Sequence, residues 1–151
     1  MRLTATQITT ALQDLKCFEG VFARDRLPLN VSKPALLVVN TDDSSEPGEH
    51  WVSVYTGVNN KAIFFNSFGL PPLSPEVIDF VARNATSLQY CNVVLQDAFS
   101  ETCGYFCIAF GRHVAKGGTL SSFVSFFTHQ GVTLQEPMMS SSYDCCAAIA
   151  A

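Results

Sequence analysis

The chain has 151 residues, of which 48% are hydrophobic, and this length and composition suit one domain with a substantial core. Its 13 acidic residues outnumber its nine Lys and Arg, which form no run, so neither nucleic acid nor an anionic membrane is expected as the main partner. No apolar run approaches the ~18 residues that would cross a bilayer. The start, MRLTATQITTALQDL, is too polar for a signal peptide, so we expect the cytoplasm or nucleus, where thiols stay reduced.

The first half of the chain predicts one helix and three strands. Residues 4–15 place their apolar side chains on one helical stripe and begin at a Thr that can cap the helix. The run ALLVVN (35–40) has the length and the continuous apolarity of a buried central strand. HWVSVY (50–55) and AIFFNSF (62–68) are two further strands, and the turn residues GVNNK between them predict a hairpin.

The second half predicts three helices and one strand. A Ser-Pro pair begins a helix over 75–84, and CNVVLQ (91–96) is a fourth strand candidate. Apolar residues recur at helical spacing from Cys103 to a Gly-Gly pair, and a last helix follows from Leu120 to near Gly131.

The predicted elements follow the order helix, three strands, helix, strand, two helices. This order is typical of an α+β fold with a small, mostly antiparallel sheet packed by helices. We expect a single domain over residues 1–137. Residues 138–151 are low in complexity and are expected to form a flexible tail.

Cysteines are the most informative residues for chemistry. Their spacings form no disulfide framework, and no second pair of ligands accompanies Cys103 and Cys107 to complete a zinc site. Neither a metal nor another cofactor is therefore expected. The chain has six in all: Cys17, Cys91, Cys103, Cys107, Cys145 and Cys146.

Cys103 opens a predicted helix, where the helix dipole favours a thiolate, and Gly104 leaves room for a substrate carbonyl. A nucleophilic thiol also needs a histidine as its base. His113 lies about 15 Å further along the same helix, and His129 lies near the end of the last one. His50 opens a strand after a loop, where catalytic groups are often mounted, although a histidine there can equally be structural.

Two amides are candidates to complete such a site. Asn66 lies among phenylalanines in the third strand, and the predicted hairpin would bring it near His50 as the group that orients the ring. Gln96 precedes Cys103 by seven residues and could stabilise an oxyanion together with the Cys103 N–H. Taken alone, either amide could instead face solvent.

The motifs GEHW, FFNSFG, Gln96 and CGYFC follow one another in an order that resembles the adenovirus-type cysteine endopeptidases, the adenain family, which includes proteases of adenovirus-like viruses and virus-like transposons. The resemblance covers roughly residues 8–130. It implies the compact α+β cysteine-protease fold that this family shares with the proteases of ubiquitin-like modifiers. It also implies a thiol protease (a hydrolase) that cleaves viral precursor proteins after small, Gly-rich sites during virion maturation.

Site residues follow from the resemblance one by one. Cys103 matches the nucleophile, His50 the general base and Gln96 the oxyanion-hole glutamine. Trp51 matches the Trp after the histidine, which together with Gly104 we assign to substrate binding. Asn66 stands where the family has an acidic orienter, so it can orient the ring of His50 but cannot stabilise an imidazolium by charge.

The resemblance implies a polypeptide substrate, allows an activating peptide as a second partner, and places the protein in the host cell and the virion. We expect a monomer, and the acidic charge argues against activation by DNA. Two alternatives keep the same residues. One is an isopeptidase that removes ubiquitin-like modifiers, and the other is a catalytically silent, protease-like assembly or binding module, which the change to Asn66 would favour.

Overall fold

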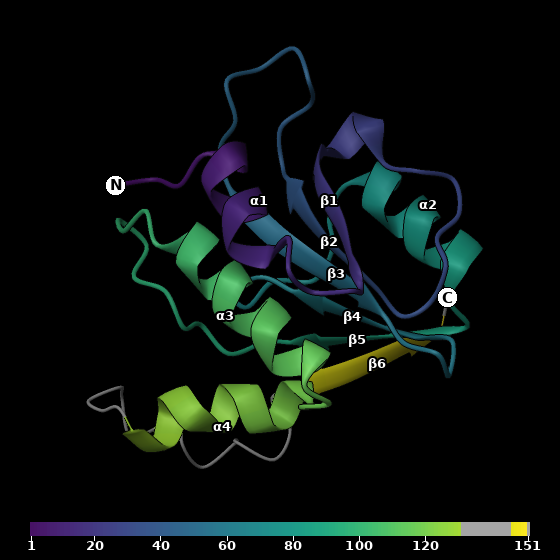
Figure 1. Cartoon of the computed structure of the whole chain (residues 1–151). Helices are drawn as coiled ribbons and strands as arrows, with labels where there is room; N and C mark the ends of the chain where they lie inside the picture. Colours follow the sequence, from purple (N-terminus) through teal and green to yellow (C-terminus); the bar gives the residue numbers. More distant parts are fainter. Residues whose placement is uncertain (131–145, 151) are drawn as a thin grey trace.

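A six-stranded mixed sheet is the frame of the computed structural model, which describes residues 1–130 and 146–150 (Figure 1). Its strands lie side by side in chain order: β1 (Phe18–Ala23), β2 (Ala35–Asn40), β3 (Trp51–Thr56), β4 (Lys61–Phe65), β5 (Ser87–Cys91) and β6 (Cys146–Ala150). The pairs β1–β2 and β4–β5 are parallel, and the other three are antiparallel. The α+β class is confirmed.

Most strand pairs are antiparallel, as expected, but two are parallel, so the sheet is mixed. Parallel neighbours need a crossover connection, and the chain supplies two. A loop with a short 3-10 helix, η1 (Arg24–Arg26), leads from β1 to β2, and a helix leads from β4 to β5.

The predicted helices are confirmed: α1 (Ala5–Leu12), α2 (Pro75–Asn84), α3 (Cys103–Ala115) and α4 (Leu120–Gln130). Side-chain oxygens of Thr4 and Ser74 accept backbone N–H groups in the first turns of α1 and α2, which explains why these helices begin where they do. None of the helices among the described residues is both long and apolar enough to cross a membrane.

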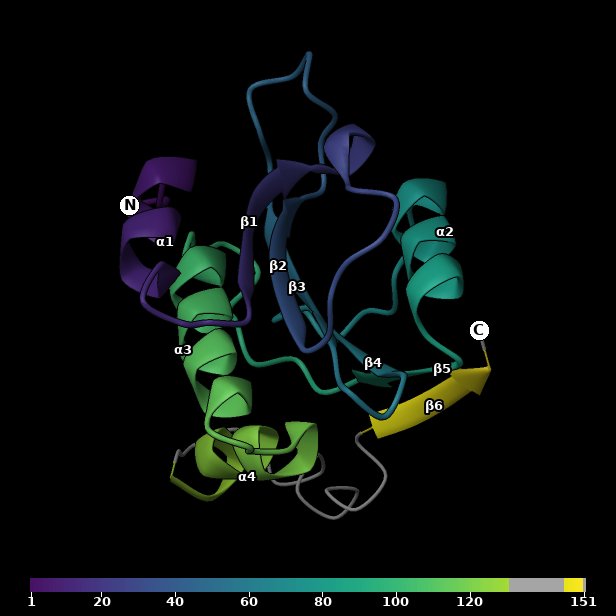
Figure 2. The ribbon, with the colours of Figure 1, turned by 45° about the vertical axis from the view of Figure 1, so that its right-hand side comes forward.

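Both faces of the sheet are covered, which explains the unbroken apolar run of β2. Leu36 and Val38 belong to the core shared with α1, α3 and α4, whereas Leu37 and Val39 belong to the core shared with α2. Figure 2 shows α1 and α3 on one side of the sheet and α2 on the other. Helix α3 lies close to the sheet because Gly111 has no side chain; a Cβ there would lie 2.7 Å from Leu36 Cδ2.

Two strands were not predicted. In β1 the sequence FEGVFA breaks apolar alternation with Glu and Gly, and its register against β2 shifts between Phe18 and Gly20. β6 pairs with β5 across more than fifty residues of chain. It falls within the expected tail, of which residues 138–145 and 151 lie outside the described part of the chain.

Two strand boundaries are corrected. The fourth predicted strand, 91–96, is mostly not a strand: β5 is formed by the preceding residues and ends at Cys91. The third strand ends at Phe65, so Asn66 follows β4 and does not lie in its centre. The predicted hairpin is confirmed, since β3 and β4 pair antiparallel.

Candidate active site

A cavity of about 200 Å³ lies between the loop before β3, the loop after β4 and the N-terminus of α3. His50, Gln96 and Cys103 all line it, although more than fifty residues separate the first from the last. The other lining residues are Arg2, Glu49, Phe68, Ala98, Ser100 and Glu101. The structure thus brings three of the sequence-predicted site residues together around one hollow.

Asn66 lies directly behind His50. Its Oδ1 is 2.8 Å from Nε2 of His50 and also accepts the backbone N–H of Phe68, at 2.9 Å. A backbone N–H can only donate, so the atom facing it must be the amide oxygen, and Nε2 of His50 must then carry the proton. In the neutral ring the lone pair is therefore on Nδ1, the nitrogen that a base would use.

Two further features hold the ring of His50. The ring of Phe68 stacks on it, with centroids 4.5 Å apart and planes inclined by 21°. Burial lowers the pKa of His50, although the hydrogen bond that its Nε2–H donates to Asn66 acts in the opposite direction. Burial, the larger effect, favours the neutral imidazole, while the contacts with Asn66 and Phe68 orient it.

Replacing Asn66 with Asp should raise the pKa of His50. The carboxylate keeps both acceptor contacts and adds a negative charge beside the ring, which stabilises the imidazolium. We expect the ring to titrate below its ordinary value of about 6.5 in the wild type and at clearly higher pH in Asn66→Asp. The measurement is an NMR titration of the His50 ring.

The matched control is Asn59→Asp, which makes the same charge change at an exposed position in the turn between β3 and β4. An equal rise in the pKa of His50 in both variants, or none in Asn66→Asp, would contradict the orienting role.

The lowered pKa of His50 also makes the stability of the wild type depend on pH. Since the folded state lowers the pKa of His50, its contribution to folding is complete above about pH 6.5 and is lost as the pH falls through the lowered value.

Gln96 is buried, and its amide is fixed at both ends. Nε2 donates to the backbone carbonyl of Ser100 at 2.8 Å, and Oε1 accepts from the hydroxyl of Ser67. A carbonyl can only accept, so this contact places the NH₂ group on the side of Ser100, which also lines the cavity. One Nε2 hydrogen is used in that bond and the second remains for an oxyanion.

Cys103 is the first residue of α3, and its side chain is buried at the cavity. Thr102 makes no side-chain cap, so the first N–H groups of this helix keep their donor capacity, whereas α1 and α2 begin with side-chain caps. Cys107, one turn further on, is fully buried, and burial raises its pKa to about 12. Of the two thiols, only Cys103 lines the cavity.

Trp51 and Gly104 do not line this cavity. The indole Nε1 of Trp51 donates to the backbone carbonyl of Leu3 at 2.9 Å. A Cβ on Gly104 would lie 3.0 Å from Leu3 Cβ and 3.3 Å from Trp51 Cδ1. Both residues therefore pack the N-terminal segment against α3, and their assignment to substrate binding stays a prediction.

The segment Asn66–Gly69 positions both halves of the site. Ser67 holds Gln96 through its hydroxyl, and its carbonyl accepts the backbone N–H of Gln96 at 3.0 Å. Gly69 has a φ of +71°, and a Cβ there would lie 2.8 Å from the backbone of Val93, so only glycine allows this approach. Sequence reasoning missed Ser67 and Phe68, although the motif FFNSFG contains both.

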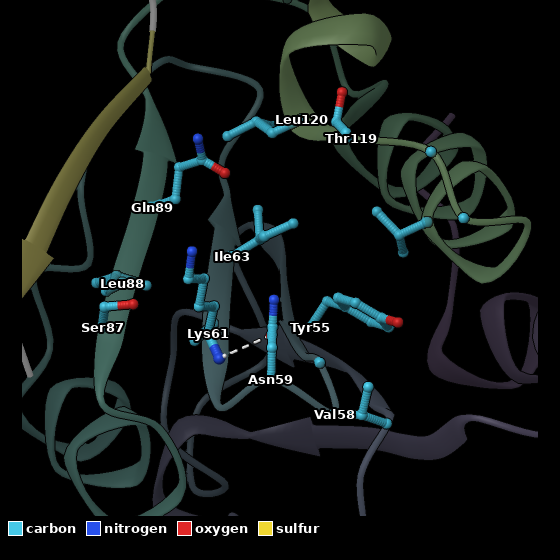
Figure 3. A pocket seen from close by; sticks show the side chains of 15 residues that line it. Tyr55, Val58, Asn59, Lys61, Ile63, Ser87, Leu88, Gln89, Thr119 and Leu120 are labelled. Carbon is cyan, nitrogen blue, oxygen red and sulfur yellow. Dashed lines mark hydrogen bonds between the residues drawn. The ribbon is translucent and has the colours of Figure 1, made fainter.

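A different cavity, of about 450 Å³, lies near the opposite end of β3, where Tyr55 is one of its lining residues. Figure 3 shows side chains of Ile63, Gln89 and Leu120 around it. Its lining residues include no histidine or cysteine, so it cannot supply a Cys-His pair. Among residues 1–130 and 146–150, no group of three His, Cys, Asp or Glu could hold a metal ion.

Comparison with known proteins identifies no family for the chain: no protein-family model matches it, and no curated protein matches it. The arrangement of thiol, imidazole and two amides is what a thiol-dependent hydrolase of the Cys-His type requires. The resemblance to adenovirus-type endopeptidases stays a prediction that rests on the motifs GEHW, FFNSFG and CGYFC.

Proposed function

We propose that the protein is a cysteine endopeptidase in which Cys103 is the nucleophile and His50 the base. The observation that carries the proposal is the chain of contacts from the Phe68 N–H through Asn66 to His50, which leaves Nδ1 as the basic nitrogen in the cavity that Cys103 lines. An amide can orient the base without a carboxylate, because the neutral ring needs only an acceptor at Nε2.

The reaction uses the groups in turn. Nδ1 of His50 takes the proton of the Cys103 thiol, and the thiolate attacks the carbonyl carbon of a peptide bond. The Gln96 amide and the Cys103 N–H stabilise the oxyanion. The C–N bond breaks, and His50 gives its proton to the departing amine. Water, deprotonated by His50, then attacks the thioester, releases the acid and restores the thiol.

The substrate class follows from the resemblance to the adenain family. We propose polypeptides cut after small, Gly-rich sites, such as viral precursor proteins, and we propose action in the host cell and the virion. An isopeptidase for ubiquitin-like modifiers would use the same residues. Cleavage of a Gly-Gly peptide without cleavage of any modifier conjugate supports the endopeptidase.

Alkylation at neutral pH tests the thiol–imidazole pair. We expect iodoacetamide to label Cys103 rapidly, and we expect His50→Ala to slow this labelling and to lower peptide turnover about a hundredfold or more. The measurement is mass spectrometry of the labelled peptide against time.

His113→Ala is the control for this test, since His113 bonds to Ser122 on α4 and does not line the cavity. If Cys103 stays inert at neutral pH in the wild type, or reacts equally fast in His50→Ala, the enzyme hypothesis is rejected. The alternative of a catalytically silent binding module then remains.

A further inference from the structure

A separate cavity, of about 340 Å³, lies on the face of the sheet that α2 covers. We call it the α2 cavity. Its apolar walls include Val39, Val52 and Phe64 of three neighbouring strands and Val77 of α2, and the proline-rich segment 71–75 contributes further lining. Cavities that hold small ligands are mostly apolar in this way and begin at about 300 Å³.

Asn66 connects the α2 cavity to the candidate active site. It lines the α2 cavity and not the catalytic one, while its Oδ1 accepts the ring N–H of His50 and the backbone N–H of Phe68. Its Nδ2 has no hydrogen-bond partner among the described residues, although Asn66 is only 8% exposed. The described polar side-chain atoms that are fully enclosed without a partner are Ser53 Oγ and Thr56 Oγ1, so Nδ2 of Asn66 is open to the cavity. A nearly buried amide donor of this kind favours a ligand that brings an acceptor.

The charges around the α2 cavity favour an uncharged ligand. Among the described residues that line it, only Arg24 is charged. Its Nη1 lies 2.8 Å from Oε2 of Glu76, and its Nη2 lies 3.7 Å from Oδ2 of Asp43. An anion would meet these two carboxylates beside the guanidinium, and a cation would meet the guanidinium itself.

We propose that the α2 cavity binds an uncharged small molecule that has an apolar body and a carbonyl oxygen, which accepts a hydrogen bond from Nδ2 of Asn66. Binding at this site goes beyond the proposed protease and does not depend on Cys103. It still reaches the base through one side chain, because a carbonyl at Nδ2 polarises the amide and makes Oδ1 a stronger acceptor for the ring N–H of His50. The ligand is therefore an effector that acts on the base from outside the catalytic cavity.

N,N-Dimethylbenzamide is the probe for this site, because it has an aromatic body, one carbonyl oxygen and no charge. We expect it to bind the wild type with a Kd on the order of 1 mM, as small fragments do, and to shift the side-chain NH₂ resonances of Asn66 in an NMR titration. Two probes of similar size test the ligand class. Benzoate is an anion, and N,N-dimethylbenzylamine has CH₂ in place of the carbonyl and is a cation at neutral pH. Both should bind about tenfold more weakly or not at all.

Two variants test the place of binding. Asn66→Asp removes the donor and keeps the acceptor contacts, so it should weaken binding of N,N-dimethylbenzamide about tenfold or more. Leu73→Trp enlarges an exposed side chain of the lining and should also weaken binding. The matched controls are Asn59→Asp and Leu70→Trp, which make the same changes at exposed positions outside the lining and should bind the probe as the wild type does.

The ring of His50 reports whether the site is coupled to the base. Bound N,N-dimethylbenzamide should raise the pKa of His50 in the wild type, by less than Asn66→Asp does, because the probe polarises the amide without adding a charge. The other charges near the ring are separate from the probe. The charged residues that line the catalytic cavity with His50 do not line the α2 cavity; they are Arg2, Glu49 and Glu101.

The outcomes separate this proposal from the proposed function. Iodoacetamide should still alkylate Cys103 when the probe is bound, and protection of Cys103 would place the probe in the catalytic cavity and overturn the α2 site. Absence of binding, binding that Asn66→Asp leaves unchanged, or equal binding of all three probes would also overturn it, and each would leave the protease in place. Binding without a change in the pKa of His50 would overturn the effector role. A Cys103 that is inert in the free protein would reject the protease, whereas binding at Asn66 would stand.

Discussion

Cys103→Ala should abolish detectable peptide hydrolysis. The substitution removes the atom that forms the thioester, and among the described residues no other thiol lines the cavity to replace it. The measurement is turnover of a Gly-Gly peptide at high enzyme concentration, together with loss of the iodoacetamide-labelled peptide.

Cys107→Ala is the matched control for this experiment, because it makes the same change one turn further along the same helix. The Cys107 thiol is buried against Ser53 in the core and has a raised pKa, so its removal should cost some stability and leave kcat nearly unchanged. If activity were lost in Cys107→Ala and kept in Cys103→Ala, the nucleophile would be Cys107 and our assignment would be wrong.

The sequence predicted the contact between His50 and Asn66 for a reason that the structure makes more specific. Residue 53 pairs with 65 and residue 54 with 64, so continuing this register places Phe68 opposite His50 and Asn66 opposite Val52. Asn66 therefore reaches His50 as a diagonal neighbour, two residues along the opposite chain. The hairpin pattern shows the proximity, but not that Phe68 covers the ring.

Other features depend on contacts between distant residues that no local pattern reveals. The sequence did not reveal that Leu3, 48 residues before Trp51, packs against both Trp51 and Gly104. The strand predicted at 91–96 does not form. β5 ends at Cys91, and the backbone N–H of Gln96 donates to the carbonyl of Ser67 in the loop after β4. The signal for this strand was apolar composition, which cannot distinguish packing against a sheet from packing against a loop.

Gln96 contributes both to the proposed catalysis and to the stability of the fold. Its buried amide bridges Ser67 and Ser100, so it joins the loop after β4 to the loop before α3. This bridge fixes the distance between the oxyanion donor and the thiol. We therefore expect a substitution here to act on catalysis and on folding through different atoms of one side chain.

Gln96→Ala should lower kcat by roughly a hundredfold or more, because it removes one of two oxyanion donors. It should also cost about 1–3 kcal/mol of stability, since the buried hydroxyl of Ser67 loses its acceptor. Ser67→Ala separates the two effects: it loosens the amide at Oε1 and leaves the Nε2 donor in place, so its kcat should fall less. Gln89→Ala, the same change in the distant cavity, is the control.

The decisive comparison is between turnover and alkylation in Gln96→Ala. Alkylation of Cys103 by iodoacetamide passes through no oxyanion, so its rate should stay near that of the wild type while kcat falls. Equal losses in both would show that the substitution disturbs the thiol itself. Full turnover in Gln96→Ala would show that the amide takes no part in the mechanism. The Cys103 N–H, at the start of α3, would then be the remaining oxyanion donor.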